Sequence, residues 1–243
     1  MTTTEFQTEQ RRGRVGPWMG VAFVMFFVGG FLVFSGPNTT SNSASNTAKW
    51  DAWWNVSHHR TEAIIGAYLM VVGVLAFVWF ACSLAQRLRE RTDAMMMIVF
   101  ASLFASLALT SALIRAAIPG GKVFGRLAVP GGNLPEQLDN IGMALLLVAG
   151  AVSAGAFVAS ACHAARRSVV FPTWLTISGY VVALAQLAAA FFLPFALFPL
   201  WVLAASIVLL VRDAKFAAGS MAEGHPERRT LRRHRSEHPL ADL

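Results

Sequence analysis

The stretch AIIGAYLMVVGVLAFVWFACSLA, residues 63–85, contains 23 residues and no charged side chain. As a helix it would be about 35 Å long, which exceeds the roughly 30 Å thickness of the hydrocarbon core of a bilayer. The rest of the chain has a similar character, because 56% of its 243 residues are hydrophobic and 14% are charged. Soluble domains average about 25% charged residues. The sequence therefore predicts an integral membrane protein.

Further apolar segments predict an all-α bundle of six membrane-spanning helices. The expected spans are residues 16–35, 63–85, 94–117, 141–162 and two within 171–211, where Pro194 and Pro199 favour a break between helices. The sixth helix is short if it begins at Phe195, and a re-entrant hairpin that does not cross the bilayer is the alternative. A cleaved signal peptide is the alternative for residues 16–35, but this run is longer than the apolar core of about 7 to 15 residues typical of such peptides.

The basic residues near the span ends predict the orientation. Fifteen of them fall on one side of the predicted membrane and five on the other, and Lys and Arg are enriched in cytoplasmic segments. We therefore expect a plasma-membrane protein with a cytoplasmic N-terminus (1–15), a six-span domain (16–212) and a basic cytoplasmic tail (213–243) without fixed structure. The tail is expected to attract anionic lipid headgroups, and nucleic acid is not an expected partner. External loops are expected near 36–61 and 118–140.

Three tryptophans stand out in the first external loop. Trp50, Trp53 and Trp54 have the i, i+3, i+4 spacing of one helical face. We expect a short amphipathic turn at the level of the lipid headgroups, where tryptophan is enriched. A ligand-binding aromatic cage is the alternative.

The predicted spans lack ionisable side chains at their centres. Neither His nor Lys lies in the middle of a span, which argues against haem ligation and a retinal Schiff base. Gln186 and a few hydroxyl groups are the polar side chains there. No cofactor or metal is expected, and a polar path for a transported solute is hardly provided.

Charged side chains gather instead at the external ends of the spans. We predict a polar binding cluster there, lining an outward-facing pocket and formed by His58, His59, Arg60, Glu62, Arg115 and Asp139. The alternative is purely local, since acidic residues in a first turn and basic residues in a last turn stabilise helix ends. Metal binding is not expected, because adjacent histidines point apart and no spaced partner completes a ligand set.

The predicted fourth span is rich in small residues. Ala151, Gly155 and Ala159 form a continuous ridge that allows close helix packing. We therefore expect this helix to be central in the bundle. Dimerisation through such a surface is the alternative.

The segment HRTEAIIGAYL, residues 59–69, opens the second span after a basic N-terminus, one span and a polar loop. In this arrangement the chain resembles uncharacterised six-helix membrane proteins of actinobacteria. The resemblance implies a polytopic bacterial membrane protein and transfers neither a reaction nor a catalytic residue. We expect a non-enzymatic binding or accessory role, with a membrane protein or a second copy of the chain as possible partners. A small-solute transporter or channel is the second hypothesis, and an intramembrane enzyme is the third.

Overall fold

The computed structural model describes residues 3–34, 36–37, 43–88, 90–130, 132–168, 170–191 and 193–223. Every regular element in these ranges is a helix, which confirms the all-α prediction. The elements are α1 (Thr3–Val33), α2 (Ser43–Asn55), α3 (Ser57–Ala85), α4 (Arg91–Phe124), α5 (Leu134–Ala144), the π-helix η1 (Leu145–Gly150), α6 (Ala151–Ser168), α7 (Thr173–Ala185), the 3₁₀-helices η2 (Gln186–Phe191) and η3 (Leu193–Ala196), and α8 (Leu197–Glu223).

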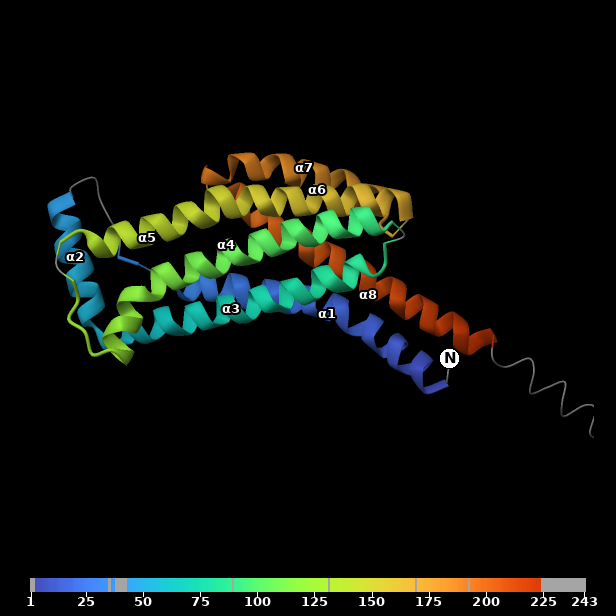
Figure 1. Ribbon diagram of the computed structural model, residues 1–243, viewed down its shortest axis with the longest axis horizontal. Coiled ribbons are helices and arrows are strands. Elements are labelled where there is room, and N and C mark those ends of the chain that lie inside the picture. Colours follow the sequence, from blue (N-terminus) through green and yellow to red (C-terminus); the bar gives the residue numbers. More distant parts are fainter. Residues whose placement is uncertain are drawn as a thin grey trace, which may run out of the picture.

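The long helices lie side by side along one axis, and α5, η1 and α6 form one continuous rod (Figure 1). Helix α1 begins and α8 ends at the same end of this bundle, which we call the base (Figure 1). Helix α2 lies across the opposite end (Figure 1). We call that end the head: α2 together with the parts of α3, α4 and α5 next to it. The α7–α8 hairpin turns back before it reaches α2.

Five helical segments are long and apolar enough to cross a membrane: Val15–Val33, Ser57–Ala85, Arg91–Phe124, Leu134–Ser168 and Leu193–Lys215. A sixth apolar helix, Thr173–Ala189, is shorter. The short helix is thus the fifth predicted span. The proline positions had suggested that the sixth span would be the short one. Pro194 lies in η3 and Pro199 in the first turn of α8, where a missing N–H group costs little because it has no intrahelical partner.

Several helices continue past their predicted ends. Residues 118–124 extend α4, and residues 134–140 belong to α5, so much of the predicted loop 118–140 is helical. Residues 213–223 extend α8 and shorten the predicted unstructured tail, whose remainder lies outside the described residues. With 34 residues, α4 is about 51 Å long, which exceeds the roughly 30 Å hydrocarbon core. The head contains the ends of these long helices, with α2 lying across them (Figure 1).

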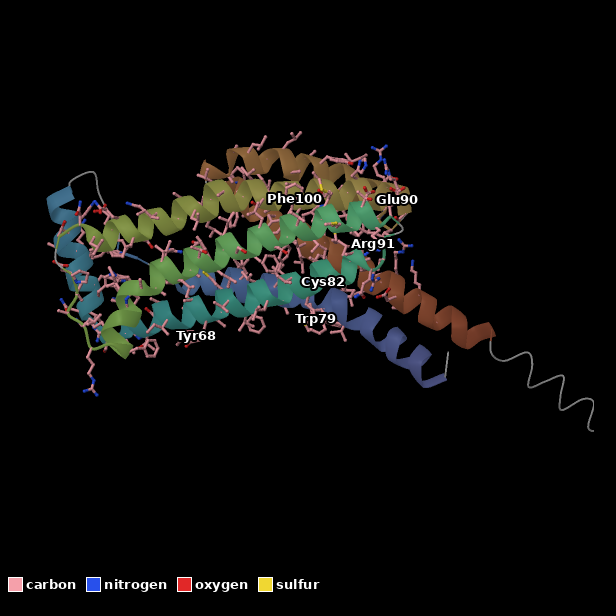
Figure 2. The ribbon with its side chains drawn as sticks, in the orientation of Figure 1. Tyr68, Trp79, Cys82, Glu90, Arg91 and Phe100 are labelled. Carbon is pink, nitrogen blue, oxygen red and sulfur yellow. The ribbon has the colours of Figure 1, made fainter. Side chains whose placement is uncertain are left out.

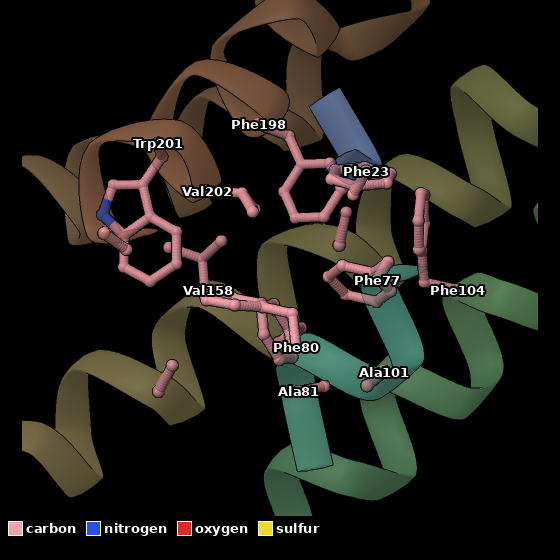
Figure 3. Packing of buried hydrophobic residues seen from close by; sticks show 14 of the residues in the cluster. Phe23, Phe77, Phe80, Ala81, Ala101, Phe104, Val158, Phe198, Trp201 and Val202 are labelled. Carbon is pink, nitrogen blue, oxygen red and sulfur yellow. The ribbon is translucent and has the colours of Figure 1, made fainter. Parts of the chain in front are cut away.

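Phenylalanine rings fill the middle of the bundle (Figure 3). Phe23 of α1, Phe77 of α3, Phe104 of α4 and Phe198 of α8 are each fully buried. Their ring centroids lie 4.9 to 6.4 Å apart, at tilted or edge-on angles that aromatic pairs prefer. By contrast, Tyr68 and Trp79 point away from the bundle (Figure 2), and more than half of each is exposed. The bundle therefore buries aromatic rings and also presents them outward, as a lipid-facing surface allows.

Small residues set the helix spacing. Half of the apolar window of the α5–α6 rod is buried, the largest share among the five long segments, as expected for a central helix. Gly155 faces α7, where a Cβ would lie 2.9 Å from the Ala183 carbonyl oxygen. The sequence analysis missed a tighter approach between α1 and α3. There a Cβ on Gly30 would lie 2.6 Å from the carbonyl oxygen of Gly66, which brings the two backbones into direct contact.

Candidate functional site

The head has its own small hydrophobic core, built around two tryptophans. Trp50 and Trp54 of α2 are 4% and 2% exposed and pack with Phe34, Ala63 and Ala67. The predicted helix in this loop is confirmed, but its aromatic face is turned toward protein. The expectation of a headgroup-level anchor was therefore wrong for Trp50 and Trp54, because the projecting ends of α3 and α4 offer an apolar surface that the indole rings cover.

Polar contacts hold α2 to its neighbours. The Asn46 side-chain amide donates to the Glu136 carboxylate on α5 at 3.1 Å, and Asn46 is almost fully buried. At the other end of α2, Lys122 of α4 donates to the Asn55 side-chain oxygen. These contacts fix α2 across the ends of α4 and α5, so the head is a packed unit.

The centre of the candidate site is an ion pair between α4 and α5. The Arg115 Nε atom donates to the Asp139 carboxylate at 2.7 Å. The Arg115 side chain is 5% exposed and that of Asp139 is 21% exposed. The guanidinium carbon also lies 4.2 Å from the centroid of the Phe34 ring and 5.7 Å from that of Phe31. Phe31 of α1 and Phe34, directly after α1, thus add cation–π contacts to the ion pair.

A glycine makes room for this arginine. A Cβ on Gly142 would clash with Arg115 Cγ and would lie 3.0 Å from its Cδ and 3.1 Å from the Ser111 carbonyl oxygen. Ser111 Oγ donates to the Gly142 carbonyl oxygen at 2.7 Å. Arg115 therefore lies along the bare backbone of Gly142, where α4 and α5 are also joined by a buried hydrogen bond.

The two histidines meet Glu62 on the outer surface of the head. His58 Nε2 and Glu62 Oε1 are 3.0 Å apart, and His59 Nδ1 and Glu62 Oε2 are 3.3 Å apart. The His59 ring also stacks on Trp53, with 3.6 Å between the ring centroids and a 6° interplanar angle. This group is more exposed than the Arg115 pair, and 74% of the His58 side chain is accessible.

Arg60 has a local role at the end of α2. Its Nη1 atom donates to the carbonyl oxygens of Trp54 and Asn55 at 2.7 and 2.9 Å. The last carbonyl groups of a helix lack intrahelical partners, so Arg60 stabilises the C-terminus of α2. This matches the local alternative for part of the predicted cluster.

The six predicted site residues thus form three groups: the Arg115–Asp139 pair, the His58–His59–Glu62 group, and Arg60 as a helix cap. Sequence reasoning placed all six in one cluster, and the structure divides them because each group has its own partners. It also missed Phe31, Phe34, Ser111 and Gly142. Only the spacing of Ser111 and Arg115, one helical turn apart, hinted that a polar patch on α4 faces a neighbour.

Several buried polar atoms of the head have no hydrogen-bond partner among the described residues. They are Arg115 Nη1, Asp51 Oδ1 and the Nε1 atoms of Trp50 and Trp53. A buried donor or acceptor without a partner costs about 1 to 3 kcal/mol. The head therefore offers donors and an acceptor that a ligand or ordered water can satisfy. Within the same described ranges, no group of three or more His, Cys, Asp or Glu side chains is placed to hold a metal ion.

Comparisons of the chain with models of known protein families, with curated proteins and with solved structures found no match. The resemblance to actinobacterial membrane proteins therefore stays a prediction from the sequence.

Proposed function

We propose that the chain is a six-span plasma-membrane protein with both ends in the cytoplasm and a non-enzymatic binding or accessory role, exercised through its head. The observation that carries the proposal is the contrast between the interior of the bundle and the head. Phenylalanine rings from α1, α3, α4 and α8 occupy the interior. The head holds ion pairs and four of the six buried polar side-chain atoms that have no hydrogen-bond partner among the described residues; the other two are Gln186 Oε1 in the bundle and Asp93 Oδ2 at the base.

The same contrast weighs against a transporter or channel. A solute path needs polar groups or water along the bundle axis. The interior of the bundle is instead filled by the fully buried rings of Phe23, Phe77 and Phe104. Gln186, the polar side chain of the predicted fifth span, is partly used within the fold: its amide donates to the Pro194 carbonyl oxygen at 2.8 Å, across the α7–α8 turn, while its Oε1 atom is buried without a partner among the described residues. This supports a packed scaffold that presents the head.

The orientation can be tested by labelling single cysteines with a membrane-impermeant maleimide. In a chain whose native Cys82 and Cys162 are replaced, Ala52→Cys places a thiol on the exposed surface of α2, and Thr92→Cys places one at the base. We expect Ala52→Cys to react in intact cells and Thr92→Cys to react only after permeabilisation. The reverse pattern would invert the proposed topology, and labelling of both in intact cells would remove the membrane span between them.

The binding role can be tested by site-specific photo-crosslinking in living cells. A photo-reactive amino acid at position 58 samples the exposed surface of the head, and the same residue at position 92 samples the base as the matched control. We expect one discrete crosslinked product of fixed size from position 58, weakened by Glu62→Gln, which removes the negative charge beside His59. A product from position 92 alone, or equal products from both positions, contradicts a role centred on the head.

A further inference from the structure

An apolar groove runs along the outer surface of the bundle between α1 and the start of α8. Its volume is about 310 Å³, and all of its lining side chains are apolar. Helix α1 contributes Val24, Phe27, Val28, Phe31 and Leu32, the i, i+3, i+4, i+7, i+8 stripe of one helical face. Ala196, at the end of η3, contributes part of the opposite wall.

The dimensions of the groove suit an acyl chain. The α1 stripe from Val24 to Leu32 covers about 12 Å, which is most of one leaflet of the hydrocarbon core. The stripe ends close to the C-terminus of α1, on the side of the head. A chain lying in the groove therefore has its polar end at the level where the head begins.

Arg115 does not line the groove but lies beyond that end of it, next to Phe31. Phe31 lines the groove and also lies 5.7 Å from the Arg115 guanidinium carbon, so one ring contacts both. Asp139 occupies the Nε edge of the guanidinium, and Nη1 is buried without a hydrogen-bond partner among the described residues. The unpaired N–H group of a cation, near the end of an apolar groove, can donate to an anionic oxygen that is attached to a hydrocarbon chain.

We propose that this groove and Arg115 form a binding site for an anionic membrane lipid, whose acyl chain lies against α1 and η3 and whose phosphate oxygen accepts a hydrogen bond from Arg115 Nη1. This inference rests on the proposed function and names a ligand class for the head. Because Nη1 is buried next to Phe31, binding in this mode requires the partly exposed Phe31 ring to move aside. The Asp139 carboxylate already binds the Nε edge of the guanidinium, so the lipid phosphate binds at the Nη1 edge.

The test is native mass spectrometry of the full chain in mild detergent, titrated with phosphatidylglycerol or with phosphatidylcholine of identical acyl chains. We expect the first phosphatidylglycerol to bind about tenfold more tightly than the first phosphatidylcholine, as one charge-assisted contact allows. Arg115→Gln should bring this ratio to near one. Arg126→Gln removes a positive charge from an exposed position of the α4–α5 connection, and it should leave the ratio unchanged.

The groove itself is tested by filling it. Ala196→Trp places an indole in the groove from an exposed position and should weaken both lipids about equally, by fivefold or more. Val181→Trp, on the exposed face of α7 outside the groove, is the matched control and should change neither affinity. If the two tryptophan variants bind lipid with equal affinity, the groove is not the binding site.

A third variant keeps the test decisive if Arg115→Gln does not fold. Asp139→Asn keeps the hydrogen-bond acceptor for Arg115 Nε but removes the competing negative charge, so phosphatidylglycerol should bind several-fold more tightly. Unchanged or weaker phosphatidylglycerol binding in a folded Asp139→Asn protein overturns the role of Arg115. These affinities are independent of the crosslinking at position 58, so failure of either experiment is attributable to its own proposal.

Discussion

The two ends of the bundle use ion pairs in different surroundings. In the head, the Arg115 side chain is 5% exposed and is enclosed by Asp139, Gly142 and the phenylalanines of α1. At the base, Arg167 of α6 pairs with Glu90 at 2.8 Å, and both side chains are about half exposed. Arg87 binds both oxygens of Asp213 on α8, at 2.9 and 2.8 Å, and these two side chains are about one quarter exposed.

From this difference we expect burial, and not the number of basic residues, to determine how much the loss of a charge costs the fold. The base has many arginines, which is the basis of the proposed orientation, but water screens their ion pairs. The head has fewer, and Asp139, Gly142, Phe31 and Phe34 surround one of them, Arg115, and keep it from water. Four substitutions test the comparison through the free energy of unfolding, measured by denaturant titration in mixed micelles and followed by circular dichroism.

Trp54→Ala should have the largest effect. Trp54 is 2% exposed in the core of the head, and truncation of a buried tryptophan costs about 3 to 5 kcal/mol. Trp79→Ala, on the outward face of α3, is the control and should change stability by less than about 0.5 kcal/mol. Equal losses in the two variants would mean that the head does not pack as a core.

Arg115→Ala should cost somewhat less, about 2 to 3 kcal/mol. Removal of one partner from a buried ion pair costs about 3 to 5 kcal/mol, but Asp139 keeps some contact with water, which reduces the penalty. The cation–π contact with Phe34 is lost as well. Arg126→Ala, in the exposed connection between α4 and α5, should be nearly neutral, and a matching loss there would contradict a special role for Arg115.

Gly142→Ala tests the space that Arg115 occupies. The added methyl group meets the arginine stem and the Ser111 carbonyl oxygen, and overpacking of this kind costs about 1 to 3 kcal/mol. We expect a loss of about 1 kcal/mol that becomes smaller in an Arg115→Ala background, as a double-mutant cycle would show. Strict additivity of the two substitutions would indicate that the side chain does not lie against Gly142.

Arg87→Ala should have the smallest effect, about 1 kcal/mol or less. Its two-point contact with Asp213 joins the end of α3 to α8, yet both groups remain partly hydrated, and such pairs contribute about 0.2 to 1 kcal/mol. Salt should reduce the difference between Arg87→Ala and the parent protein. A loss as large as that of Arg115→Ala would erase the contrast between the two ends.

Sequence reasoning was strongest where one physical quantity dominates. The helical character and the long apolar segments follow from hydropathy and length, because backbone groups in lipid must be satisfied within each helix. The helix at Trp50–Trp54 also follows from its spacing. The direction of its aromatic face does not, because an indole suits both a headgroup layer and a protein core. The lengths of α4 and α8 were underestimated; at the end of α4 the helix continues where Pro119 is buried and Lys122 donates to Asn55 of α2.

The amino-acid sequence by itself determined that this chain forms apolar helices and that its charges gather at their ends, because both properties are sums over local residue types. Only the tertiary structure decided which charges meet. The partnership of Arg115, Asp139 and Phe34 depends on contacts between α4, α5 and α1, and the separation of Arg60 depends on where α2 ends. Such contacts depend on how rigid helices of unequal length pack against one another, and no local pattern in the chain encodes that geometry.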